Sequence, residues 1–151
     1  MRQKEGEFRN PSGCAIAAVI SRSGERMSGE KIIESMKPMH ERSNGLGGGF
    51  AGYGIYPEYK DLFALHLFFT DKAVRHECET YLRTELELVK AEVIPTRTIP
   101  AITDEPLIWR YFVTPLRSVL AGMQVDENEY IARLVMYINT HIDGAYVFSS
   151  G

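Results

Sequence analysis

Short apolar segments that alternate with amphipathic helices are the feature that most constrains the fold of this sequence. The clearest helix is predicted over 71–91, where apolar residues recur at helical spacing behind Asp71, a residue type that caps helices well. A second helix is predicted over 127–142, behind Asp126. Both segments are long enough to cover a sheet with one apolar face.

A third helix is predicted to begin near Ser28 and to run through 29–42, with Pro38 loosening its last turn. Its apolar face consists of isoleucine and methionine residues. Strand-like runs separate the three helices. They lie at 14–20, 50–56, 61–69, 92–100, 106–116 and 145–150.

The order of these elements favours a layered α/β or α+β sandwich, and α+β is the predicted class. Strands occur in adjacent groups between the helices, an arrangement too irregular for a doubly wound parallel sheet. The run at 14–20 is apolar throughout, so it is expected to be a buried strand. No repeat or interdomain linker interrupts the sequence.

Composition limits the classes of partner. The 151 residues are 44% hydrophobic and 25% charged, values typical of an ordinary globular domain. A net charge of −3 gives no electrostatic reason to expect nucleic acid or an anionic membrane surface. The apolar runs are too short to span a bilayer, and residues 1–13 lack the apolar core of a secretory signal, so a cytoplasmic location is expected.

The sequence has few residues that could ligate a metal through sulfur or imidazole: two cysteines and four histidines. Two cysteines, Cys14 and Cys78, make neither a disulfide framework nor a four-ligand zinc site. Cys78 lies on the apolar stripe of helix 71–91 and is expected in the core, whereas Cys14 could be a small buried residue or a nucleophile. The histidines are interpreted as structural or solvated, and no metal site is expected. They are His40, His66, His76 and His141.

Residues 47–52 match the pattern G-x-G-x-x-G literally. A dinucleotide-binding loop of this kind needs a strand before it and a helix after it, and here the predicted order is reversed. Nucleotide binding is therefore the weaker interpretation. A loop in which the backbone passes close to another group is the stronger one.

Residues 14–55 resemble the start of class II glutamine amidotransferases, which are N-terminal-nucleophile hydrolases, and are most similar to the amidotransferase domain of the glutamate synthase large subunit and its stand-alone relatives. The likeness rests on a cysteine that opens an aliphatic strand, followed by a turn, a helix, and a loop with Arg42 and several glycines. It continues through 105–115 and 127–150. Ala15 replaces the usual glycine, and Glu41-Arg42-Ser43 replaces His-Arg-Gly.

The resemblance implies a four-layer αββα sandwich, of which residues 14–151 are the N-terminal part. It implies that Cys14 is the nucleophile once a propeptide-like segment, 1–13, is removed, because the free α-amino group then moves the proton. Arg42 would form part of the wall of the site on the substrate side. Glutamine would be hydrolysed to glutamate, and the ammonia delivered to a synthase partner; this chain itself would hold no cofactor, and any flavin or iron–sulfur cluster would belong to the partner.

The family's other site residues are expected downstream of the strand at 145–150. They are an Asn-Gly pair that forms the oxyanion hole, an arginine that binds the substrate carboxylate and an aspartate that binds its amine. Asn44-Gly45 lies in a different segment and is not assigned that role. The alternative from another class is a non-catalytic amidotransferase-like module for assembly or regulation, with Cys14 an ordinary core thiol.

Overall fold

The computed structural model describes residues 14–42, 48–100 and 102–151, with the backbone alone for residues 40 and 41. The chain divides into two compact units, Met1–Tyr53 and Gly54–Gly151. The predicted 1–13 propeptide-like segment and the Asn44-Gly45 pair lie outside the described residues.

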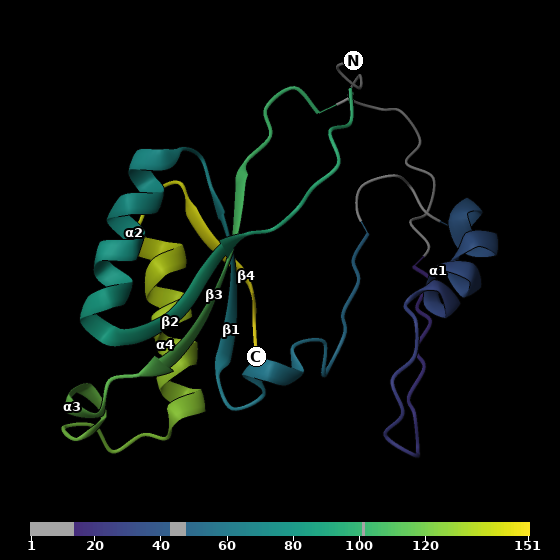
Figure 1. Ribbon diagram of the computed structural model, residues 1–151. Coiled ribbons are helices and arrows are strands. Elements are labelled where there is room, and N and C mark those ends of the chain that lie inside the picture. Colours follow the sequence, from purple (N-terminus) through teal and green to yellow (C-terminus); the bar gives the residue numbers. More distant parts are fainter. Residues whose placement is uncertain (1–13, 43–47, 101) are drawn as a thin grey trace, which may run out of the picture. The chain divides into compact units, whose positions relative to one another are not determined.

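The second unit is a four-stranded antiparallel sheet covered by helices (Figure 1). Its main elements follow the order β1 (Phe63–Phe69), α2 (Lys72–Glu85), β2 (Leu86–Val93), β3 (Leu107–Pro115), α4 (Glu127–His141) and β4 (Ala145–Ser150). The strand order is β2-β3-β1-β4, and every neighbouring pair is antiparallel. This is the split β-α-β or ferredoxin-like arrangement, so the predicted α+β class is confirmed.

One face of the sheet carries the core. Because side chains alternate along a strand, Leu65, Leu67 and Phe69 of β1 point toward α2 and α4, and each is fully buried. Figure 1 shows both helices on this side of the sheet. Leu134 and Ile138 of α4 complete the contact, as helical spacing predicts.

Both predicted aspartate caps are confirmed. The Asp71 carboxylate accepts hydrogen bonds from the backbone N–H groups of Ala73 and Val74, at 2.7 and 3.0 Å. The Asp126 carboxylate accepts one from Glu129 at 2.8 Å. Each cap satisfies donors that have no partner within their own helix, so the two long helices begin where the sequence places them.

Helix α2 is shorter than predicted. It ends at Glu85, and residues 86–91, expected to continue it, belong to β2. Leu86 is extended, with φ −132° and ψ 150°, and pairs with Pro115 of β3. Val89, expected on the buried helical stripe, is instead 50% exposed. Pairing with β3 outweighs the helical propensity of this segment.

In the described part of the first unit, residues 14–42 and 48–53, there is one short α-helix, α1 (Glu30–Met36), continued by a 3₁₀ turn, η1 (Lys37–Arg42). The Ser28 hydroxyl accepts a hydrogen bond from Glu30 N–H at 3.2 Å, close to the predicted helix start. The change from α to 3₁₀ geometry falls between Met36 and Lys37, directly before Pro38, which lacks the backbone donor that a continuing α-helix would use.

Two strand predictions in the N-terminal half are wrong for the described residues. The segment 14–20 is extended but forms no strand, and it is not buried: Ile16 and Ile20 are 93% and 88% exposed. No described residue pairs with its backbone, and without a partner strand an apolar segment stays uncovered. The segment 50–56 also forms no strand, and 92–100 is strand only through Val93.

No described helix is both long enough and apolar enough to cross a membrane. The described secondary structure of the second unit is one sheet with the long helices α2 and α4 on one face. The four-layer sandwich that the resemblance implies would need a second sheet stacked on the first, and the described residues of this unit do not form one.

Candidate functional site

The two cysteines lie in different environments. Cys14 is exposed at the start of the extended segment 14–20. Cys78 is fully buried in the core of the second unit, as predicted. Burial, reinforced by the charges of Glu79 and Glu77, raises the pKa of the Cys78 thiol to about 12. Because the thiolate is the reactive form, Cys78 is inert at neutral pH, and Cys14 is the accessible thiol among the described residues.

The residues expected around Cys14 are only partly described. Arg42 is exposed at the end of η1. Gly48 and Gly49 are exposed, and a Cβ atom at either position would meet nothing within 4 Å. These two positions therefore show no close backbone approach, and Gly47 lies outside the described residues. Among the described side chains, no contact brings Arg42 to Cys14.

The most connected polar group of the second unit was not predicted from the sequence. It lies on the sheet face opposite the core, where Glu92, Arg110 and His66 occupy paired positions on β2, β3 and β1. Arg110 donates to the Glu92 carboxylate through both Nε and Nη2. Its Nη1 donates to the Tyr56 hydroxyl at 2.9 Å, and that hydroxyl lies 2.8 Å from His66 Nε2. We call these four residues the Tyr56 clasp.

The Tyr56 hydroxyl links Arg110 to His66. It accepts a hydrogen bond from Arg110 and is hydrogen-bonded to His66 Nε2, where the tautomer of the imidazole decides which group donates. His66 Nδ1 is shielded from solvent without a partner at hydrogen-bond distance and angle. Burial, followed by the charge of Arg110, lowers the pKa of His66, while the backbone of Ser149 has the opposite effect.

Aromatic contacts reinforce the clasp. The Tyr59 ring stacks on Phe112 with ring centroids 3.9 Å apart, and the Tyr56 ring meets Phe112 edge-on at 5.0 Å. The Arg110 guanidinium lies 4.6 Å from the centroid of the Tyr56 ring. Together these contacts hold the chain before β1, including the 3₁₀ turn η2 (Pro57–Tyr59), against the sheet.

The other described histidines do not form a site. His76 is exposed on α2, and the His141 ring stacks on Tyr137 at a centroid distance of 4.4 Å. No group of three potential metal ligands occurs among the residues that the structure describes. The interpretation of His66, His76 and His141 as structural or solvated agrees with these positions; the side chain of His40 lies outside the described part of the chain.

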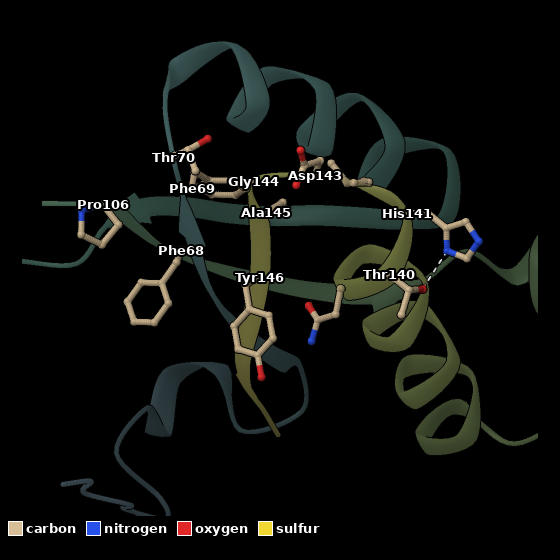
Figure 2. Close-up of a pocket in the computed structure, with 12 residues that line it drawn as sticks. Phe68, Phe69, Thr70, Pro106, Thr140, His141, Asp143, Gly144, Ala145 and Tyr146 are labelled. Carbon is tan, nitrogen blue, oxygen red and sulfur yellow. Dashed lines mark hydrogen bonds between the residues drawn. The ribbon is translucent and has the colours of Figure 1, made fainter. Parts of the chain in front are cut away.

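A cavity of about 420 Å³ lies at the edge of the sheet beside β4 (Figure 2). The rings of Phe68 and Tyr146 point to one side of the sheet there, and Asp143 and Gly144 belong to the turn between α4 and β4. Phe68 and Tyr146 are paired positions on β1 and β4, so both rings stand on the face opposite the core.

Most polar groups of this cavity are already committed to the fold. The Asn139 side chain donates to the Val147 carbonyl at 3.1 Å and accepts from the Val147 N–H at 2.7 Å. The Thr140 hydroxyl donates to the Met136 carbonyl at 2.7 Å and lies 2.8 Å from His141 Nδ1. The cavity therefore presents no nucleophile–base pair, and its polar side chains stabilise the end of α4 and the edge of β4.

A comparison with known proteins gives one informative similarity. The chain is 46% identical over 140 residues to an uncharacterized protein of Archaeoglobus fulgidus, across 91% of this chain. The chain spans 37% of the length of that relative. No family model matches the chain. No solved structure matches it either.

Proposed function

We propose that this chain is the N-terminal part of a class II glutamine amidotransferase domain of the glutamate synthase type, with Cys14 as its nucleophile. The supporting observation is the contrast between the two thiols: Cys14 is exposed at the start of an apolar segment, and Cys78 is buried and protonated. The sequence around Cys14 supplies the resemblance to this family.

In the proposed reaction, the Cys14 thiolate attacks the side-chain amide carbon of glutamine and forms a tetrahedral adduct. The α-amino group of Cys14 takes the thiol proton and passes it to the departing nitrogen, so ammonia leaves and a glutamyl thioester remains. Water then cleaves the thioester, which releases glutamate and restores the thiol. The α-amino group can do this only when residues 1–13 have been removed, since otherwise it is a peptide amide.

The exposed apolar residues of the first unit support an association with further polypeptide. Among its described side chains none is buried, and Ile16, Ile20 and Tyr53 are 93%, 88% and 99% exposed. A segment this short cannot form its own core. In the proposed four-layer sandwich, 14–20 would be an inner strand, covered by protein of the kind that makes up the remaining length of the Archaeoglobus relative.

The remaining parts of the proposal follow the resemblance. Arg42 would form the wall of the site around Cys14, and the oxyanion donors and the substrate clamp would come from polypeptide outside residues 14–150. The ammonia would pass to a synthase subunit or domain, which would hold any flavin or iron–sulfur cluster.

The test is covalent labelling of the natural protein with a diazoketone analogue of glutamine, followed by digestion and mass mapping. The expected result is one adduct per chain, on Cys14. Cys14→Ser should abolish the adduct, and Cys78→Ala, the matched control at the buried thiol, should retain it.

Two outcomes would contradict the proposal. An adduct on Cys78 would place the chemistry elsewhere. No adduct on either cysteine, in protein that is folded by circular dichroism, would instead favour the non-catalytic amidotransferase-like module in which Cys14 has no chemical role.

A further inference from the structure

A row of aromatic rings crosses the sheet face opposite the core. From the Tyr56 clasp outward, the ring centroids of Tyr56 and His66 are 5.8 Å apart, and those of His66 and Phe148 are 5.9 Å apart. Phe148 stacks on Phe68 at 4.3 Å, and Tyr146 occupies the position on β4 that is paired with Phe68 (Figure 2). We call these residues the aromatic stripe. Its outer end is open to solvent in the described part of the chain, where Tyr146 and Phe148 are 54% and 42% exposed.

The charged groups beside the stripe are already engaged. Arg110 donates to the Glu92 carboxylate and to the Tyr56 hydroxyl, and Lys90 Nζ lies 2.9 Å from Oε2 of that carboxylate. A stacking platform for single-stranded nucleic acid needs cations that are free to follow the phosphates. Because Glu92 engages these two cations, the open end of the stripe favours an apolar partner over a phosphate backbone.

Strand addition at the edge of β4 is blocked at Val147. The Asn139 side chain donates to the Val147 carbonyl and accepts from the Val147 N–H, so it takes the place of a neighbouring strand there. A partner that covers the stripe therefore packs on its face and does not extend the sheet.

Gly151 lies close to the open end of the stripe. It exchanges two backbone hydrogen bonds with Ala64, of 2.7 and 3.3 Å, so the chain is held against β1 up to this residue. Phe148 precedes it by three residues, a distance of about 10 Å in extended chain. The Archaeoglobus relative is longer than this chain, which spans 37% of it. Polypeptide that follows Gly151 in a longer natural protein would therefore start beside the stripe.

We propose that the open end of the aromatic stripe is the docking surface for an apolar face of the polypeptide that follows Gly151, which fixes the second unit against the rest of the amidotransferase domain. The inference rests on the proposed function only in that this chain is part of a longer domain. Attachment at Gly151 raises the effective concentration of the occupant at the stripe, so a modest apolar contact is enough to hold it. Burial of the Tyr146 and Phe148 rings supplies the driving force.

Hydroxyl-radical footprinting tests whether the stripe is covered. The rate of side-chain oxidation is measured by mass spectrometry in the 151-residue chain and in the full-length natural protein. Tyr146 and Phe148 should be oxidised about 5-fold more slowly in the full-length protein, since the core of an interface is packed like a protein interior. Tyr137 is the matched control: it is 42% exposed, belongs to α4 on the other side of the sheet, and should react equally in both proteins.

A photo-crosslinker identifies the occupant. With p-benzoylphenylalanine in place of Tyr146, the expected product is a crosslink within one full-length chain to residues beyond Gly151, and the same group in place of Tyr137 should not form it. Equal oxidation of Tyr146 and Phe148 in the two proteins would overturn the proposal, as would an equal slowing at Tyr137. A crosslink from position 146 only to a second copy or to another protein, or no crosslink beyond Gly151, would also overturn it.

These measurements do not depend on glutaminase activity, so the two proposals can fail separately. Full-length protein that takes up the glutamine analogue on Cys14 but leaves the stripe exposed would refute the docking alone. A covered stripe in protein without an adduct on Cys14 would refute the proposed function alone.

Discussion

Gly144 lies in the turn between α4 and β4, where it packs against Thr70 and Val74 at the start of α2. Replacing it tests how tightly these two parts of the second unit are packed. Its φ of +84° is in the left-handed region, which costs an L-residue about 1–2 kcal/mol. A Cβ atom there would also lie 2.5 Å from Thr70 Oγ1 and 3.3 Å from Val74 Cγ2. Both neighbours belong to the β1–α2 junction, and Thr70 N–H donates to the Gly144 carbonyl at 3.0 Å.

Gly144→Ala should therefore destabilise the second unit by two separable amounts. Backbone strain contributes about 1–2 kcal/mol, and crowding against Thr70 adds about 1–3 kcal/mol. Urea unfolding followed by the fluorescence of the single tryptophan, Trp109 in β3, measures the sum. In a Thr70→Ala background the crowding is relieved, so Gly144→Ala should cost only the strain.

Gly122→Ala is the matched control, because a Cβ at Gly122 meets nothing within 4 Å and its φ is not positive. It should change stability by less than about 0.5 kcal/mol. A Gly144→Ala variant as stable as the Gly122→Ala control would show that neither strain nor crowding acts at Gly144. An equal cost of Gly144→Ala with and without Thr70→Ala would show that Thr70 is not the obstructing group.

Three further predictions concern single side chains. Asp71→Ala should lower the unfolding free energy by about 1 kcal/mol in urea, since the α2 cap loses two hydrogen bonds; no change would contradict the capping role. Asn139→Leu should leave the N–H and C=O of Val147 unpaired at the free edge of β4, and size-exclusion chromatography should then show concentration-dependent self-association; a variant that stays as monomeric as the parent would argue against edge protection. Iodoacetamide should alkylate Cys14 in the native chain and leave Cys78 unmodified, because a pKa of about 12 against an ordinary 9.0 reduces the thiolate of Cys78 about 1000-fold; equal rates for the two cysteines would contradict its burial.

The elements of the second unit were predictable where local signals are strong. Asp71 and Asp126 mark the starts of α2 and α4, and helical spacing identifies the side chains that face the sheet. The end of α2 was not predictable in this way. The apolar residues of 86–91 fit a continuing helix, and the alternation of Leu86 and Leu88 also fits a strand. The segment is a strand because it pairs with β3, which is remote in sequence.

The Tyr56 clasp was missed for a similar reason. Tyr56 and Arg110 are 54 positions apart, and their contact exists only because β3 pairs with β1 in one register. A partial signal was present: His66 and Arg110 alternate with buried residues along their strands, which places both on the face opposite the core. Sequence alone could have put them on one face, but not beside Tyr56.

Cys14 shows the opposite case. Its proposed role as a nucleophile comes from a resemblance carried by residues 14–55, and the segment 14–20, expected to be buried, is exposed. Burial of that segment requires a partner strand, which no described residue provides. The sequence could predict an apolar strand, but it could not say which polypeptide would cover it.

In the proposed mechanism, the α-amino group of Cys14 is the base for its own thiol. The most direct measurement is the mass of the N-terminal peptide of the protein purified from the cells that make it. We expect a chain that begins at Cys14, with residues 1–13 absent. A chain that retains residues 1–13 and still takes up the glutamine analogue on Cys14 would contradict that claim, because Cys14 would then carry an amide in place of the amine.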